Sequence, residues 1–148
     1  MTLKKLLNIL SITLLLLTGS LQAQICTLDI GGKNAETMVT VFQLNEAQMA
    51  VLEALQGELA VETKSINDQI EKLLAEHPQS TQEELLKLAD KYKVLQQKMV
   101  TASYESDKKL LSEFNAKQYD RYLQLCQAAI RRPIFVVPKV YNDSIAPE

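Results

Sequence analysis

The feature that most constrains this chain is a long stretch that contains neither proline nor glycine. No residue between Gln79 and Arg132 is of either type, and the stretch is rich in Leu, Lys, Gln, Glu and Ala, which favour helices. Proline and glycine are the residues that most disfavour a helix interior. The sequence therefore predicts an all-α fold, built as an elongated helical hairpin with short flanking helices.

The first arm of the hairpin is predicted to begin at Asn45 and to end before Pro78. Asn45 can cap the helix, with Gln48 at the reciprocal position of a capping box. Leu44 and Met49 stand at the positions of a hydrophobic staple. Apolar residues then recur at steps of three, four or seven, as on one helix face: Met49, Leu52, Leu55, Leu59, Ile66, Ile70 and Leu73. The residue before a proline is pushed out of the helical region, which sets the end.

The second arm is predicted to begin at Ser80 or Thr81, since each has a glutamate three residues later, the spacing of a capping box. Its apolar stripe is close to a heptad seam. The stripe consists of Leu85, Leu88, Tyr92, Leu95, Met99, Ala102, Ser106 and Leu110. A third helix should begin near Asn115 and end with Arg131 and Arg132, whose positive charges complement the helix dipole.

The flanks of this helical domain, which spans 44–132, are predicted less directly. In the N-terminal extension, 24–43, the segment 36–42 could be a strand because of its β-branched residues, or a short helix, and the short helix is favoured. Residues 133–148 are predicted to form an extended tail that lies over the helices.

The first 23 residues have the layout of a secretory signal peptide. Lys4 and Lys5 precede an apolar core at 6–17, and Ala23 offers a small residue at the cleavage point. The core is shorter than the roughly 20 residues of a membrane span, so no stable membrane insertion is expected after cleavage. Export to the periplasm would leave a chain with 14 Lys+Arg and 18 Asp+Glu, a net charge of −4.

The mature chain keeps two cysteines, Cys26 and Cys126. In an oxidising compartment two cysteines most simply form one disulfide, here within the chain. Two separate thiols, or a bridge between subunits, remain alternatives. An intramolecular bridge would close a loop of about 100 residues and could stabilise the fold by up to about 4–5 kcal/mol in the loop-entropy model.

Charge and composition exclude several classes of function. A slightly acidic chain lacks the basic field of a nucleic-acid binder. One histidine, two cysteines and no Cys/His cluster give no metal site, and no glycine loop for phosphate or nucleophile–base arrangement is present. We therefore predict no catalytic, cofactor-binding or metal-binding residues, and a protein that is not an enzyme.

One short pattern occurs twice, 70 residues apart: an apolar residue, Asn, two variable residues and Gln. Its members are Leu44, Asn45 and Gln48 in the first copy, and Phe114, Asn115 and Gln118 in the second. Each copy reads as a helix start with a capping asparagine. With the signal peptide, the paired long helices and the short third helix, the chain from Thr37 to Pro133 resembles the Spy/CpxP family of periplasmic helical proteins. That family is marked by two Leu-Thr-x-x-Gln motifs, and here Asn replaces Thr in both copies while Phe replaces Leu in the second.

The resemblance implies a thin, bent helical hairpin that dimerises into a curved cradle. It also implies an ATP-independent periplasmic chaperone for unfolded envelope proteins, or an envelope-stress adaptor that binds a partner protein. The alternative is a structural or regulatory interaction protein that recognises one specific envelope partner and has no general chaperone activity. Either protein would bind through amphipathic helices, as a homodimer and without a cofactor.

Charge is distributed unevenly along the helices. The net charge is −5 over 45–76, +1 over 80–111 and +2 over 112–132. The faces could be solvated and pair an acidic helix with a basic one, or could steer clients. Candidate client-binding residues lie on the two arms: Met49, Leu52, Leu55, Leu59, Lys87, Lys91, Lys98 and Met99. The methionines could equally be core residues.

Overall fold

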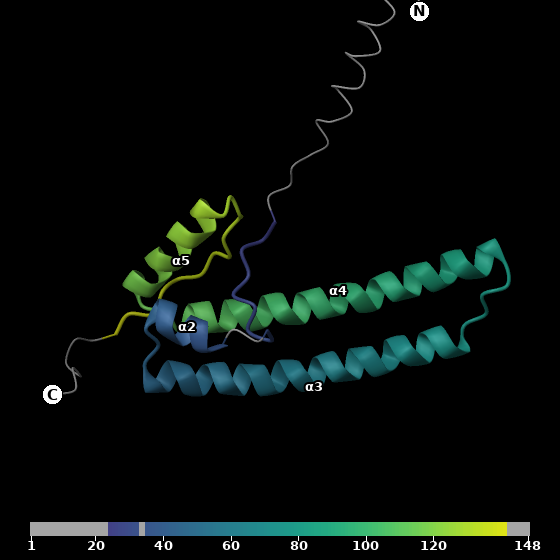
Figure 1. Cartoon of the computed structure of the whole chain (residues 1–148), viewed down its shortest axis with the longest axis horizontal. Helices are drawn as coiled ribbons and strands as arrows, with labels where there is room; N and C mark the ends of the chain where they lie inside the picture. Colours follow the sequence, from purple (N-terminus) through teal and green to yellow (C-terminus); the bar gives the residue numbers. More distant parts are fainter. Residues whose placement is uncertain (1–23, 33–34, 142–148) are drawn as a thin grey trace, which may run out of the picture.

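A computed structural model describes residues 24–32 and 35–141. The helices of this described part are α2 (Ala35–Phe42), α3 (Glu46–Glu76), α4 (Gln82–Ser112) and α5 (Ala116–Ala128). The long helices α3 and α4 run antiparallel as a hairpin, and the two short helices flank one end of it (Figure 1). The all-α prediction is confirmed, and 36–42 is helical as favoured. The predicted signal peptide, 1–23, lies outside the described residues.

Capping boxes start the three longer helices, as the sequence predicts. Asn45 Oδ1 accepts the Gln48 N–H at 2.9 Å, and Gln48 Oε1 accepts the Asn45 N–H at 3.1 Å. Asn115 begins α5 in the same way. Thr81, rather than Ser80, caps α4. Each box satisfies two backbone donors that a helix start leaves free.

The third helix ends earlier than predicted. α5 stops at Ala128, so Arg131 and Arg132 lie beyond it rather than in its last turn. Ile130 has a φ of 53°, in the left-handed region. The Arg131 N–H binds the Cys126 carbonyl at 2.9 Å, the long hydrogen bond of a Schellman motif. This left-handed turn ends α5 before the chain reaches Pro133, so the proline does not terminate the helix.

The buried core lies at one end of the hairpin, which we call the base. It contains Cys26, Ile30, Met38, Phe42, Leu44, Leu52, Leu55, Leu110, Leu111, Phe114, Tyr119, Tyr122, Cys126 and Ile134. These residues come from the predicted extension 24–43, the helical domain 44–132 and the tail 133–148. The three predicted segments therefore do not pack as separate units, because all of them contribute to one core.

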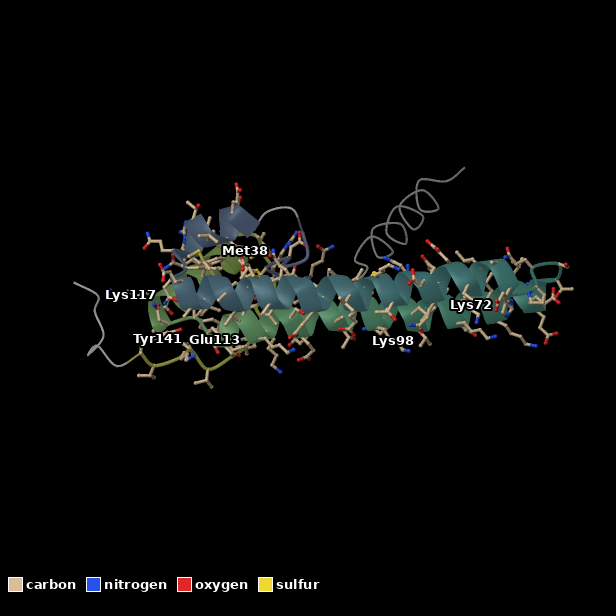
Figure 2. The ribbon with its side chains drawn as sticks, turned by 90° about the horizontal axis from the view of Figure 1, so that it is seen from below. Met38, Lys72, Lys98, Glu113, Lys117 and Tyr141 are labelled. Carbon is tan, nitrogen blue, oxygen red and sulfur yellow. A yellow bond between two sulfur atoms is a disulfide. The ribbon has the colours of Figure 1, made fainter. Side chains whose placement is uncertain are left out.

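Away from the base the molecule is a single layer of two helices. α2, with Met38, lies on one face of the hairpin, whereas Lys98 lies toward the other (Figure 2). Beyond the core, α3 and α4 bury only a few apolar side chains, including Leu59, Ile66 and Leu88. Among the described residues, no helix has both the length and the apolar character needed to cross a membrane.

Candidate functional site

The two copies of the repeated motif meet in the base. Gln48 Nε2 donates to Gln118 Oε1 at 2.8 Å, and Gln118 Nε2 donates back to Gln48 Oε1 at 2.9 Å. Both side chains are buried, at 1% and 8% exposure. The sequence indicates two separate caps, and the structure brings them into direct contact.

Each amide of this pair also binds the turn that precedes the other helix. Gln48 Nε2 donates to the Glu113 carbonyl at 2.7 Å, before α5. Gln118 Nε2 donates to the Phe42 carbonyl at 3.0 Å, before α3. The arrangement joins the α2–α3 turn to the α4–α5 turn through one buried hydrogen-bond network. It therefore holds the two ends of the hairpin together at the base.

A disulfide joins the N-terminal segment to α5. Cys26 and Cys126 are bonded within the chain across a sequence separation of 100 residues, which confirms the predicted intramolecular bridge. The Tyr122 hydroxyl donates to the Cys26 carbonyl at 2.6 Å. The Cys26 N–H donates to the Arg132 carbonyl at 2.8 Å, beside the only β-bridge of the described residues, between Ile25 and Arg132. The bridge thus fastens three segments that are distant in sequence.

Asp107 organises the same region from α4, and the sequence analysis missed it. Its carboxylate accepts the N–H of Leu28 at 2.8 Å and the N–H of Ile30 at 3.4 Å. The residue is 1% exposed, and burial raises the pKa of its carboxyl despite these hydrogen bonds. The only sequence signal for its burial was that Asp107 directly follows Ser106, a residue of the predicted apolar stripe. Asp107 therefore fixes the N-terminal segment against the hairpin.

Removing this carboxylate should loosen the N-terminal segment. We expect Asp107→Ala to lower the free energy of unfolding by about 1–3 kcal/mol, because two backbone donors lose their acceptor. The raised folded-state pKa means that Asp107 stabilises the fold most below its ordinary value of 3.8, and that this contribution is lost as the pH rises through the folded-state pKa. Urea unfolding of the wild type and Asp107→Ala measures the first effect, and urea unfolding of the wild type and Asp107→Asn across this pH range measures the second.

The control for this series is Asp90→Asn, which changes an exposed aspartate on the same helix. We expect Asp90→Asn to change the free energy of unfolding by less than about 0.5 kcal/mol, because the substitution lies on the exposed surface. The difference between the wild type and Asp107→Asn should instead shrink as the pH rises from acid toward neutral. Parallel pH profiles for those two proteins would show that burial of Asp107 does not perturb its titration.

The second notable region is a hollow between the arms, on the face opposite α2. This open groove has a volume of about 1100 Å³ and is lined only by residues 57–69 of α3 and 94–109 of α4. Leu59, Ile66 and Ala102 line it and are buried, whereas Val61 and Val94 line it at 73% and 58% exposure. A smaller hollow of about 410 Å³ continues toward the hairpin tip and shares Val94. The groove therefore offers apolar surface to solvent.

Charged side chains surround the open groove without closing it. Lys109 of α4 and Glu58 of α3 form an exposed ion pair across it at 3.5 Å. Lys98 lines the groove, and Lys91 lines the smaller hollow. An exposed pair of this kind contributes little to stability. Together with Glu62, Glu105 and Lys98, which also line the groove, this pair surrounds the apolar floor with charges of both signs.

The predicted client-binding residues divide into three groups. Leu52 and Leu55 are buried in the base core, so the structure does not present them to a client, contrary to that prediction. Leu59 is 5% exposed and only floors the open groove, while Met49 and Met99 are half-buried. The lysines are exposed, although Lys87 pairs with Glu83 on its own helix at 2.7 Å. Sequence reasoning missed Val61 and Val94, which lie off the predicted stripes.

Comparisons with protein-family models, with curated proteins and with solved structures found no match to this chain. Within the described residues, no three His, Cys, Asp or Glu side chains are grouped so that they could hold a metal ion.

Proposed function

We propose that this chain is an exported, ATP-independent chaperone or envelope-stress adaptor of the periplasm, as its resemblance to the Spy/CpxP family implies. It binds apolar segments of unfolded or partner envelope proteins in the open groove and needs no cofactor or catalytic residue. In this proposal the working form is a homodimer, and the single-layer arms of two chains together form the cradle.

The observation that carries the proposal is the uncovered apolar groove of the hairpin. A protein of two helical layers would bury such a surface, but here all lining residues belong to α3 and α4. Exposed apolar patches commonly serve as interaction surfaces. The internal disulfide supports export, because such bonds persist in oxidising compartments.

Two valines of α4 provide a matched test. Val94 lines the open groove at 58% exposure, whereas Val100 has 59% exposure and lies outside it. We expect Val94→Asp to raise the amount of protein needed for half-suppression of client aggregation by roughly fivefold or more, since a buried valine contributes about 1.5 kcal/mol. The measurement is light scattering of guanidine-unfolded malate dehydrogenase, diluted without nucleotide into increasing amounts of the protein.

Val100→Asp should suppress aggregation as well as the wild type does, and far-UV circular dichroism should show both variants helical. Wild-type protein that leaves scattering unchanged at a stoichiometric excess would contradict the chaperone proposal. In that case, capture of one dominant envelope partner that is lost in Val94→Asp would favour the adaptor. Equal loss of activity in both variants would remove the groove from the proposal.

A further inference from the structure

Among the described residues, the segment that follows α5 is hydrogen-bonded along one edge. Residues 132–137, which we call the strap, run back between α5 and α4 (Figure 1). Three N–H groups donate on its inner edge: the Arg132 N–H to the Gln24 carbonyl at 2.9 Å, the Ile134 N–H to Tyr122 Oη at 2.8 Å and the Val136 N–H to Tyr119 Oη at 3.3 Å. The Tyr119 hydroxyl also donates to the Ile134 carbonyl at 2.9 Å. Alternate residues of the strap therefore face inward.

The intervening residues form the outer edge. The N–H groups of Phe135 and Val137 have no hydrogen-bond partner among the described residues. Phe135 is 75% exposed and Val137 is 87% exposed, whereas Ile134 between α5 and the core is 1% exposed. This alternation of burial is that of an extended strand, whose successive side chains point to opposite faces. The alternating N–H bonds of the inner edge show the same extended geometry in the backbone. An extended segment with an unpaired edge is a template for another strand.

A small basic pocket lies beside this outer edge. It has a volume of about 340 Å³ and is lined by Ile25, Tyr104, Lys108, Arg132, Pro133 and Phe135. The lining contains two cations and no acid. Within the described residues, Lys108, Arg131 and Arg132 form no ion pair. The pocket therefore combines positive charge with aromatic walls, which suits a carboxylate on an otherwise apolar chain.

We propose that the strap is a docking site for an extended, acidic peptide segment of another protein. The segment adds as a strand to the outer edge at Phe135 and Val137, and its carboxylate enters the basic pocket at Lys108 and Arg132. A second copy of this chain is a poorer occupant, because its own strap contains Arg132 and no acidic residue that could enter the basic pocket. The site is separate from the open groove, because the groove and the basic pocket share no lining residue.

A synthetic peptide tests this docking on the full-length protein. The probe is fluorescein-labelled Asp-Val-Thr-Val-Thr-amide, and binding is followed by fluorescence anisotropy. One comparison peptide carries N-methyl groups on alternate amides, which block hydrogen bonds along one edge, and another has Lys in place of Asp. We expect saturable binding of the probe, with an affinity at least about tenfold higher than that of either comparison peptide.

Variants of the strap and its pocket locate the site. Val137→Pro removes an unbonded N–H, so it should preserve the fold and weaken probe binding by about tenfold or more. Lys108→Glu should weaken it by roughly fivefold or more, while Lys98→Glu, an exposed lysine of the same helix on the groove side, should leave it unchanged. Val94→Asp should also bind the probe normally, which separates this site from the proposed chaperone groove.

Three results would overturn the inference. Equal binding of the N-methylated peptide would exclude strand addition, whether or not Val137→Pro folds. Equal binding of the Lys peptide would exclude the carboxylate pocket. Loss of a wild-type dimer in Val137→Pro, measured by sedimentation, would show that a second copy of the chain occupies the strap.

Discussion

Replacing Cys26 and Cys126 together with alanine should lower the free energy of unfolding by about 4–5 kcal/mol. The disulfide closes a loop of 100 residues, and removing such a constraint increases the entropy of the unfolded chain by an amount of that size. Domains are typically stable by about 5–15 kcal/mol, so this is a large share of the total. Urea unfolding of the oxidised wild type and the double variant measures the difference.

Reductant provides the internal control for this prediction. Reduced wild type should unfold at the urea concentration of the double variant, and reductant should leave the double variant itself unchanged. Hydrogen exchange should show lost protection at 24–32 and in the strap before the arms of the hairpin, because the bridge fastens those segments. A difference below about 1 kcal/mol would mean that contacts at the base already restrict the loop without the bond.

Much of the fold could be predicted because its signals are local. A capping residue and its partner lie three positions apart, so Asn45 and Thr81 can be recognised from neighbouring residues alone. The effect of Pro78 on the preceding helix is equally local. Errors arose where a local rule competed with another. Arg131 fits a helix end by charge, but the left-handed turn at Ile130 ends α5 first.

The candidate sites depend on contacts that no local pattern contains. Asp107 binds backbone groups 77 and 79 residues away, and a buried aspartate cannot be distinguished by sequence from a solvated one. The inward edge of the strap depends on the hydroxyls of Tyr119 and Tyr122 in α5, which bind backbone groups 12 to 17 residues away. Val61 and Val94 were missed because they lie outside the predicted apolar stripes, although they are exposed at 73% and 58% among the described residues.

The base and the arms have different physical roles. The base gathers the disulfide, the amide pair and the buried core, so it can remain ordered while the arms expose apolar surface. Two helices alone would bury too little surface to hold a fixed geometry. A rigid base therefore allows the open groove to stay uncovered without the chain collapsing around it.

The amide pair is the second large contributor that the structure identifies. We expect Gln118→Met to lower the free energy of unfolding by about 2–4 kcal/mol, because Gln48 and the Phe42 carbonyl lose partners in a buried site. Gln48→Met should cost a similar amount. Gln124→Met, an exposed glutamine on the same helix as Gln118, should change stability by less than about 0.5 kcal/mol.

The double variant decides whether the two glutamines act as one unit. Each single substitution should leave the remaining glutamine amide without its partner. In that case the double variant Gln48→Met/Gln118→Met should lose less free energy of unfolding than the sum of the two single losses, by about 1–3 kcal/mol. Replacing both partners of a buried hydrogen bond removes the unsatisfied group as well as the bond. Strictly additive losses would instead show that each glutamine contributes only its own cap, at Asn45 or Asn115, and that contact between the two motif copies does not stabilise the base.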